Sequence, residues 1–348
     1  MAEAGLMRAV GVSDGGGGAE ALYLDTGPVA RPASGEFLIE VHAAALNHAD
    51  LYQRDGEFPA PPGAPDILGV EAAGFVASPD PTGSFKVGTP VMGLLAGGGY
   101  AEYASVDPGL AAEIPAKIDF ASAAALPEAL IVGHTNLVEL GRIREGSRVL
   151  IHGGASGMGS MMIQMAADMG ALVATSVSDL AKAPRLKDLG AAIVLDRCGA
   201  DFVAAASDWC EEAGFDLIVD IAGASTLRQN VELLGEKGAL NLMGVLSGTV
   251  TEVDLDPIIL KRLEIRGTIL RPTPIEEKRR LAARAYSHWL PRVAAGAIRP
   301  VVDSVHRLED VRAAHSRLES GRHVGKIVLA VRDGENRNHA VRRVGQTR

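Results

Sequence analysis

The sequence predicts an α/β protein with two domains, one β-rich and irregular and the other a doubly wound parallel sheet. Three observations support this prediction. The chain has 348 residues, which is enough for two hydrophobic cores. Its first third consists of short β-like runs interrupted by proline and glycine. After residue 121, short apolar strands alternate with helices.

The first third has the pattern of an antiparallel domain. Segments such as Phe58–Pro65 (FPAPPGAP) contain the proline and glycine that end strands. The runs expected to form strands are Phe37–Val41, Val70–Val76, Thr89–Met92 and Gly99–Val106.

The middle of the chain predicts the parallel sheet. Continuous apolar strands separated by helical segments of about ten to fifteen residues are typical of a sheet covered on both faces. The expected strands are Val149–Ile151, Leu172–Thr175, Ile193–Leu195, Leu217–Ile221 and Ala239–Met243, and the expected helices are Met161–Met169, Leu180–Leu189 and Phe202–Ala213. A strand (Ile265–Leu270), a long helix (Ile275–Ala295) and a last run (Lys326–Val331) fit a return to the first domain.

Composition excludes several classes of function. The formal net charge of −9 disfavours non-specific binding to nucleic acid or to an acidic membrane. The two cysteines, Cys198 and Cys210, exclude a disulfide framework and suit a reducing compartment. The uncharged stretch Val149–Ala167 contains four glycines and follows a strand–turn–helix pattern, so we expect a buried β–α unit and no membrane span. These features predict a soluble, cytoplasmic protein.

The turn between the first parallel strand and its helix is the strongest functional signal. It reads GASGMG, and its candidate cofactor-binding residues are Gly154, Ser156, Gly157, Met158 and Gly159. A glycine turn in this position brings a phosphate close to the backbone and to the unpaired N–H groups of the helix. Serine holds the second glycine position, so the fingerprint is imperfect, but the surrounding β–α pattern favours a dinucleotide site.

The end of the second strand indicates which dinucleotide binds. NAD sites usually place an acid there, and Val177 occupies that position. Asp179 lies two residues later, where it could hold the ribose or cap the next helix. Without a carboxylate at the strand end, Ser176, Ser178 and Lys182 could hold a 2′-phosphate, which favours NADPH.

Several stretches together resemble the zinc-independent quinone oxidoreductases of the medium-chain dehydrogenase/reductase superfamily, and most closely their tumour-suppressor-inducible branch. The resemblance implies a GroES-like catalytic domain over residues 1–123 and 265–331 and a Rossmann domain over residues 124–264. The tail over residues 332–348 is polar and is expected to be disordered. The matching stretches are ALNHADLYQRDG (45–56), PPGAPDILGVEAAG (61–74), LLAGGGYAEY (94–103), AALPE (124–128), HGGASGMG (152–159), Asp220–Gly223 and Gly325–Leu329.

The resemblance also implies a site without a metal. Zinc enzymes of the superfamily carry a cysteine and a histidine ligand where this chain has Asn47 and Val70, and neither residue can serve as a thiolate or imidazole ligand. Asn47 and Tyr52 match a polar pair that donates hydrogen bonds to the acceptor, and Phe58 matches a substrate-stacking aromatic residue. Simpler roles are a turn cap for Asn47 and a half-buried aromatic for Tyr52.

The remaining cofactor contacts are likewise implied by the resemblance. They are Glu128, Gly223, Gly244, Val245, Leu246, Leu270, Arg271 and Lys326. An exposed glutamate at a helix start is the alternative for Glu128, and a surface ion pair is the alternative for Arg271. His152 is expected to be structural or to border the cofactor.

The expected function is NADPH-dependent reduction of a small-molecule quinone. Reduction of a conjugated C=C bond in enones, alkenals or enoyl thioesters is the first alternative, and a non-catalytic nucleotide-binding or crystallin-like protein is the second. The family's minimal assembly is a homodimer, which we expect to form through the edge strand of the Rossmann sheet, at Ala239–Val245 or a neighbouring strand such as Ile265–Leu270.

Overall fold

The computed structural model describes residues 5–332, so the tail expected to be disordered lies outside the described residues except for Arg332. The chain divides into two compact units. The first comprises the residues up to Glu128, Pro274–Ala294 and those from Pro300 onward, and the second comprises Ala129–Thr273 and Ala295–Arg299.

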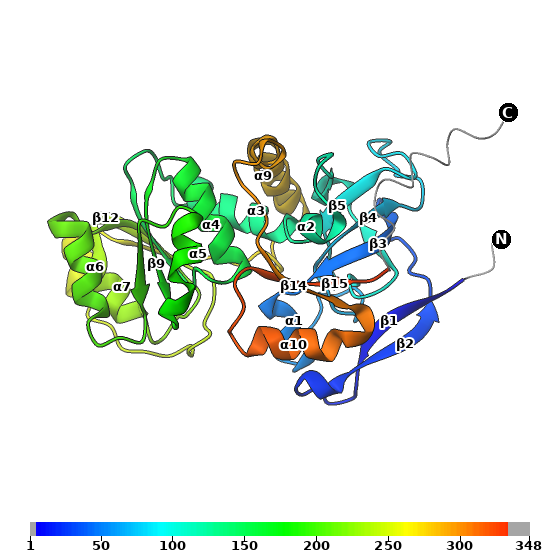
Figure 1. The fold of residues 1–348 in the computed structure, drawn as a ribbon, viewed down its shortest axis with the longest axis horizontal. Helices are drawn as coiled ribbons and strands as arrows, with labels where there is room; N and C mark the ends of the chain where they lie inside the picture. The colour runs from blue at the N-terminus through cyan, green and yellow to red at the C-terminus, as the bar shows by residue number, and fades with distance from the viewer. Residues whose placement is uncertain (1–4, 333–348) are drawn as a thin grey trace. The chain divides into compact units, whose positions relative to one another are not determined.

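A seven-stranded sheet forms the centre of the first unit (Figure 1). Its order is β14-β15-β3-β4-β5-β7, with β6 paired to β3, and every pair except β14–β15 is antiparallel. The strands are β3 (Phe37–Ala45), β4 (Glu71–Val76), β5 (Pro90–Leu94), β6 (Tyr103–Val106), β7 (Ala111–Glu113), β14 (Val302–Arg307) and β15 (Lys326–Ala330). A separate antiparallel pair consists of β1 (Leu6–Val12) and β2 (Leu22–Pro28).

Both ends of the described chain contribute to this unit. β15 pairs with β3, so the last strand of the described chain shares a core with residues near the start, including the buried Phe37, Ile39 and Leu329. This pairing puts the last expected strand, Lys326–Val331, in the first unit. The helices of the unit are α1 (His48–Arg54), α2 (Phe120–Ala124), α9 (Ile275–Ala295) and α10 (Val311–Glu319).

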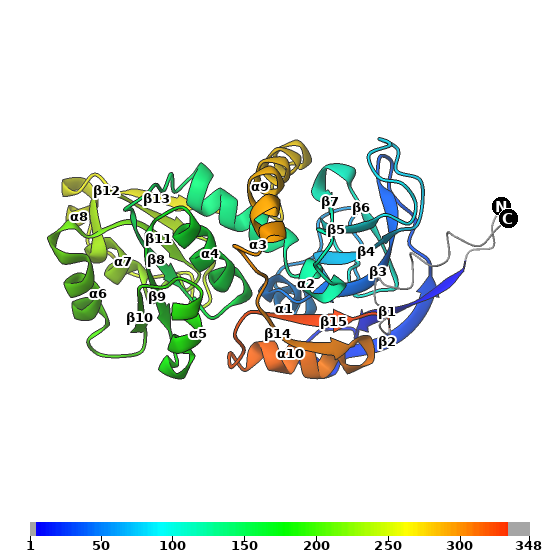
Figure 2. The same cartoon turned by 45° about the horizontal axis from the view of Figure 1, so that its top comes forward.

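The second unit contains a six-stranded parallel sheet (Figure 2). The strand order is β10-β9-β8-β11-β12-β13. All strands are parallel, and the chain adds strands in one direction from β8 and in the opposite direction from β11, which is the arrangement of a doubly wound fold. The strands are β8 (Arg148–His152), β9 (Leu172–Val177), β10 (Ile193–Asp196), β11 (Phe215–Asp220), β12 (Leu234–Leu242) and β13 (Glu264–Gly267).

Helices cover both faces of the parallel sheet, as the apolar strands predict. Figure 2 shows α4 and α5 on one face and α6, α7 and α8 on the other. These helices are α4 (Gly157–Asp168), α5 (Ala183–Asp188), α6 (Phe202–Cys210), α7 (Leu227–Leu233) and α8 (Asp256–Leu260). None of the helices in the described part of the chain combines the length and apolar character needed to span a bilayer.

Two details of the sequence interpretation need correction. The strand expected at Ile265–Leu270 pairs in parallel with β12 as β13, so it belongs to the parallel sheet and the return to the first unit begins only at Pro274. β12 lies between β11 and β13 and is not an edge strand, which removes Ala239–Leu242 as an exposed edge.

Candidate functional site

The glycine turn of the second unit has no room for side chains at two positions. A Cβ on Gly159 would overlap the Gly153 carbonyl oxygen and lie 2.7 Å from Gly154 Cα, and a Cβ on Gly154 would overlap the Thr175 hydroxyl. Helix α4 therefore begins directly against the strand ends. This close approach is the role that the sequence pattern assigns to these glycines.

Backbone donors at the start of α4 are available for a ligand. The Ser156 hydroxyl caps the helix and accepts a hydrogen bond from Gly159 N at 2.9 Å. In the described part of the chain, the N–H groups of Gly157 and Met158 have no hydrogen-bond acceptor. Two free N–H groups at the positive end of a twelve-residue helix fit a phosphate group. Ser156 is thus engaged as a cap, and the backbone around it offers the donors.

A buried hydrogen-bond chain fixes the strand ends below this turn. His152 Nδ1 lies 2.7 Å from Ser176 Oγ, and His152 Nε2 lies 2.8 Å from Asn230 Oδ1. Asn230 Nδ2 donates to Asp220 Oδ2 at 3.0 Å, so its oxygen must accept from His152 Nε2–H. The imidazole is therefore the neutral Nε2–H tautomer, with Nδ1 accepting from Ser176. A structural role for His152 is confirmed, and Ser176, whose hydroxyl is fully buried in this chain, does not face a ligand.

The end of β9 carries the other residues expected at a 2′-phosphate. Asp179 Oδ1 accepts from Ala181 N at 2.9 Å and caps the short turn Leu180–Lys182, so the capping alternative is the one that the structure adopts. Val177 is buried, Ser178 is exposed, and Lys182 is half-buried. The strand end thus offers a hydroxyl and an ammonium, while the nearby carboxylate is engaged as a cap.

Loops after β11 and β12 meet at the same edge of the sheet. Gly223 has a φ of 83°, and a Cβ there would lie 2.9 Å from Val245 Cα. A Cβ on Gly244 would lie 3.0 Å from the Ile221 carbonyl oxygen, and Leu246 N donates to that oxygen at 3.2 Å. Val245 and Leu246 are about half exposed, whereas Leu270 and Arg271 are half-buried beyond the end of β13. The structure therefore brings the predicted residues of this unit to the carboxyl edge of the sheet, where ligands bind in open α/β folds.

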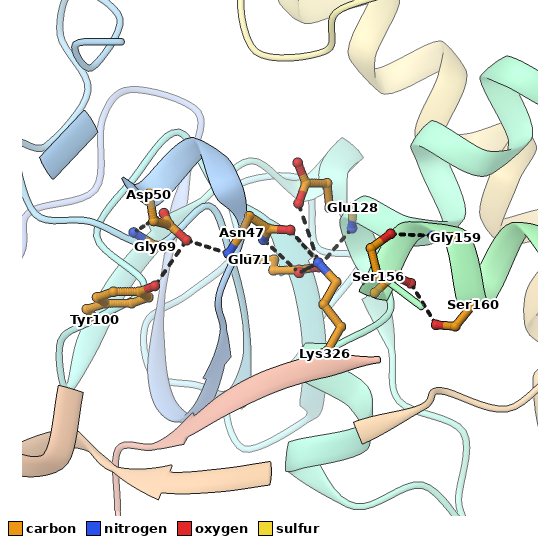
Figure 3. Close-up of polar contacts among 11 residues, drawn as sticks. Asn47, Asp50, Gly69, Glu71, Tyr100, Glu128, Ser156, Gly159, Ser160 and Lys326 are labelled. Carbon is orange, nitrogen blue, oxygen red and sulfur yellow. Dashed lines mark hydrogen bonds and ion pairs between the residues drawn. The ribbon is translucent and has the colours of Figure 1, made fainter. Parts of the chain in front are cut away.

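The first unit contains a charged group that we call the Lys326 cluster: the buried Asn47, Glu71 and Lys326, and the half-buried Glu128 (Figure 3). Lys326 Nζ, from β15, donates to Asn47 Oδ1 and to Glu71 Oε1, the latter at 2.6 Å, and lies 3.6 Å from Glu128 Oε2. Asn47 Nδ2 donates to Glu71 Oε1 at 2.9 Å. Glu128 N, at the start of α3 (Pro127–His134), donates to Glu71 Oε2 at 2.9 Å.

Burial and charge compensate each other within the Lys326 cluster. Burial lowers the pKa of Lys326, but the carboxylates of Glu71 and Glu128 outweigh it and leave the pKa above its ordinary value. The ammonium is thus held within the first unit and is only 4% exposed. We therefore reassign Lys326 from a cofactor contact to a buried ion pair.

Asp50 extends this polar region into the core of the first unit. Its carboxylate accepts hydrogen bonds from Asn47 N at 2.8 Å, Gly69 N at 3.1 Å and Tyr100 Oη at 3.0 Å (Figure 3). Burial raises the pKa of Asp50 to about 6 despite these donors and Lys326. The bond from Asn47 N fixes the start of α1, which carries Tyr52. Asn47 thus caps α1 and joins the Lys326 cluster, and one of its amide N–H groups remains for a ligand.

Tyr52 and Phe58 lie at and just beyond the end of α1. Both side chains are half-buried, and Phe58 N donates to the Tyr52 carbonyl at 3.1 Å. Among the described residues, none hydrogen-bonds to the Tyr52 hydroxyl. Burial, with a smaller contribution from Glu57, raises the pKa of Tyr52, so the phenol stays protonated and can donate at neutral pH.

Comparisons with known proteins show which proteins this chain resembles. The profile described as alcohol dehydrogenase GroES-like domain matches residues 33–116, and the one described as zinc-binding dehydrogenase matches residues 157–285. Human quinone oxidoreductase is 28% identical over 328 residues, covering 93% of this chain and 98% of that protein. Mouse synaptic vesicle membrane protein VAT-1 homolog-like is 28% identical over 349 residues, covering 95% and 83%.

The similarity extends to solved structures. Quinone oxidoreductase of Escherichia coli, complexed with NADPH, is 28% identical with a TM-score of 0.84, and the match covers 93% of this chain and 99% of that one. The chain belongs to the quinone oxidoreductase family of the medium-chain dehydrogenase/reductase superfamily. The expected fold class, a GroES-like domain with a Rossmann domain, is thereby confirmed. The narrower likeness to the tumour-suppressor-inducible branch stays a prediction.

Within this quinone oxidoreductase fold, sequence interpretation missed Glu71, Asp50 and Tyr100. A signal for Glu71 was present, because a carboxylate inside the apolar run Val70–Val76 must find a partner when the strand is buried. Tyr100 carried no such signal, since a tyrosine after three glycines looks like a loop residue. Its contact with Asp50 depends on how the loop folds against α1.

Proposed function

We propose that this chain is an NADPH-dependent, zinc-independent quinone oxidoreductase of the cytoplasm. The main support is the carboxyl edge of the parallel sheet. A glycine turn there leaves two helix N–H groups without acceptors, and the second strand ends in Val177 where an NAD site has an acid. NADPH would supply a hydride to the acceptor. The relatives that carry NADPH or the name quinone oxidoreductase add weight to this proposal.

The residues have separate roles in this proposal. The N–H groups of Gly157 and Met158 hold the pyrophosphate, and Ser178 and Lys182 hold the 2′-phosphate. Ser176 is omitted because its hydroxyl is buried against His152. Tyr52 donates a hydrogen bond to the acceptor oxygen, with Asn47 as a second donor.

The proposal of zinc independence rests on the side chains that stand where zinc enzymes of the superfamily carry their cysteine and histidine ligands. Val70 has no ligand atom, and the Asn47 amide is bonded to Lys326 and Glu71. An ammonium 2.6 Å from Glu71 would repel a divalent cation at this place. A zinc ion has neither the ligands nor the electrostatic environment that it requires.

The acceptor class is tested by oxidation of NADPH against a panel of quinones and enones. Rapid oxidation by quinones with slow oxidation by enones supports the proposal. The reverse ranking would assign the chain to reduction of conjugated C=C bonds, because hydride transfer to either acceptor uses the same donors. No oxidation by any member would favour a non-catalytic nucleotide-binding role.

Lys182→Ala should weaken NADPH binding about tenfold while leaving NADH binding unchanged. A charge-assisted contact to phosphate contributes roughly 1.5–3 kcal/mol, and partial exposure of Lys182 places the effect at the lower end. Titration of nicotinamide fluorescence measures both affinities. Lys187→Ala, an exposed lysine on the neighbouring helix α5, is the matched control. Equal losses for the two cofactors would remove the 2′-phosphate assignment.

Tyr52→Phe should lower kcat about tenfold and leave NADPH affinity within twofold. The acceptor oxygen gains full negative charge only as the hydride arrives, so a phenol donor stabilises the transition state more than the bound acceptor. The expected decrease in kcat is smaller than the roughly 10²–10³-fold decrease that follows removal of a sole oxyanion donor, because Asn47 can also donate a hydrogen bond. Steady-state kinetics with a quinone and NADPH titration separate the two effects. Weakened NADPH binding with normal turnover would instead make Tyr52 a support for the cofactor.

A homodimer should form through β13, which with β10 is one of the two edge strands of the parallel sheet. Its face and the adjoining segments expose large apolar side chains, among them Ile259, Leu260, Ile265 and Ile269. An unpaired apolar edge is a site of association between identical chains. Light scattering should give the dimer mass, and Ile265→Lys should shift it toward the monomer. A wild-type protein that stays monomeric at all concentrations would contradict this assembly.

A further inference from the structure

The ammonium of the Lys326 cluster faces protein acceptors on every side. An ammonium has three N–H bonds. Two are taken by Asn47 Oδ1 and Glu71 Oε1, and Glu128 Oε2 lies 3.6 Å from Nζ on the remaining side. With two N–H groups engaged and its pKa raised, Lys326 is poorly suited to give a proton to a substrate.

The three carboxyl groups near this ammonium, those of Asp50, Glu71 and Glu128, differ in the number of hydrogen bonds that they accept. Asp50 accepts three hydrogen bonds, and Glu71 accepts from Lys326, Asn47 Nδ2 and Glu128 N. Glu128 Oε2, in contrast, is buried and has no hydrogen-bond donor among the described residues. One ammonium faces three acids, so the acid without a hydrogen bond is the one that should hold a proton.

Glu128 is also the acid of the Lys326 cluster with access to solvent. Its side chain is 16% exposed, compared with 0% for Glu71 and 4% for Lys326. Figure 3 shows one carboxyl oxygen of Glu128 turned toward Lys326 and the other directed away from the cluster. A group in this position can lose a proton on one side and regain one from water.

We propose that Glu128 is the proton donor that completes reduction of the acceptor. This inference rests on the proposed reductase function and assigns the source of its proton. NADPH, when bound, would supply a hydride, that is two electrons and one hydrogen, and the quinone or enone oxygen would then carry a negative charge. The Glu128 O–H bond then breaks, an O–H bond forms on the acceptor, and the resulting carboxylate takes its next proton from water.

The charges around Glu128 define its pH dependence. Burial raises the pKa of Glu128 to about 7, Lys326 on β15 opposes this, and Glu71 on β4 and Asp50 on α1 raise it further. His48, also on α1, has a pKa lowered to about 4, chiefly by burial, and so stays neutral near pH 7. The protonated form of Glu128 is the active one, so turnover should fall as the pH rises through about 7.

Glu128→Gln tests the proposal, because glutamine keeps the shape of the side chain but has no carboxyl proton to give. At pH 6 we expect kcat with a quinone to fall ten- to hundredfold while NADPH affinity stays within twofold. The ratio of wild-type to variant turnover should shrink toward one by pH 9. Glu113→Gln, an exposed glutamate on β7, is the matched control and should keep the wild-type profile.

A second measurement does not depend on turnover. Infrared difference spectra of the free protein between pH 6 and pH 8.5 should contain a protonated-carboxyl band that Glu128→Gln lacks. Glu128→Asp should restore part of the pH-dependent turnover if Glu128→Gln is inactive for structural reasons. Loss of NADPH affinity with unchanged turnover would make Glu128 a cofactor contact and overturn the inference.

The failure of this inference is distinguishable from failure of the proposed function. A wild-type protein that reduces quinones, with Glu128→Gln reducing them equally well at pH 6, overturns the inference and leaves the function in place. A wild-type protein that binds NADPH and reduces no acceptor overturns both, even when the carboxyl band is present.

Discussion

Lys326→Met is expected to lower the free energy of unfolding of the first unit by about 3–5 kcal/mol. The variant would leave Glu71, which is fully buried, without its ion-pair partner, and Glu128 without its nearest cation. Removing one partner of a buried pair costs the full desolvation of the other. Urea denaturation followed by fluorescence of Trp289, which lies in α9 of this unit, measures the change.

Two further variants test whether the loss of stability comes from the unpaired carboxylate of Glu71. Lys326→Met combined with Glu71→Gln should be more stable than Lys326→Met alone, because the unpaired charge is removed. Lys117→Met, at an exposed position of the same unit, should change stability by less than about 0.5 kcal/mol. If Lys326→Met costs no more than this control, the ammonium is not the element that holds the Lys326 cluster together.

Gly159→Ala should abolish measurable NADPH binding and destabilise the second unit by about 1–3 kcal/mol. The added Cβ would meet the backbone of Gly153 and Gly154, which cannot rotate away as a flexible side chain could. Helix α4 would have to withdraw from the strand ends and carry its free N–H groups with it. Calorimetric titration with NADPH and thermal unfolding measure the two effects.

Gly199→Ala provides the control for this substitution. A Cβ at Gly199 would have ordinary contacts of 3.4–3.5 Å with Asp196, so the same chemical change meets no backbone obstruction. We expect its stability and NADPH affinity to match the wild type. A Gly159→Ala protein with wild-type affinity would show that the cofactor phosphates bind elsewhere.

The sequence predicted the parallel sheet well because its strands are short and continuously apolar. The helix at Ile275–Ala295 was predicted with the observed bounds. β13 was predicted as a strand but assigned to the wrong domain, because an exposed four-residue edge strand carries no signal of its partner. β14 and α10 were missed, since both are short and mix charged with apolar residues.

The candidate site was predicted less completely than the fold. Local sequence identified the turn at Gly154–Gly159, because its function depends on glycine at fixed spacing. It could not separate the two roles of Asp179, which depend on whether the side chain turns toward Ala181 N. The Lys326 cluster joins residues more than 250 positions apart, and only the pairing of β15 with β3 brings them together.

The hydrogen-bond chain below the glycine turn has a consequence for how the protein responds to acidity. Burial lowers the pKa of His152 below its usual value, against the attraction of Asp220, so the ring stays uncharged through the neutral range and its hydrogen bonds do not rearrange. This hydrogen-bond chain therefore keeps one arrangement across the neutral range. In the first unit, by contrast, Asp50 and Glu128 have pKa values raised to about 6 and about 7, so these carboxyl groups change charge near neutral pH. Cofactor retention and turnover can thus follow different pH profiles in one chain.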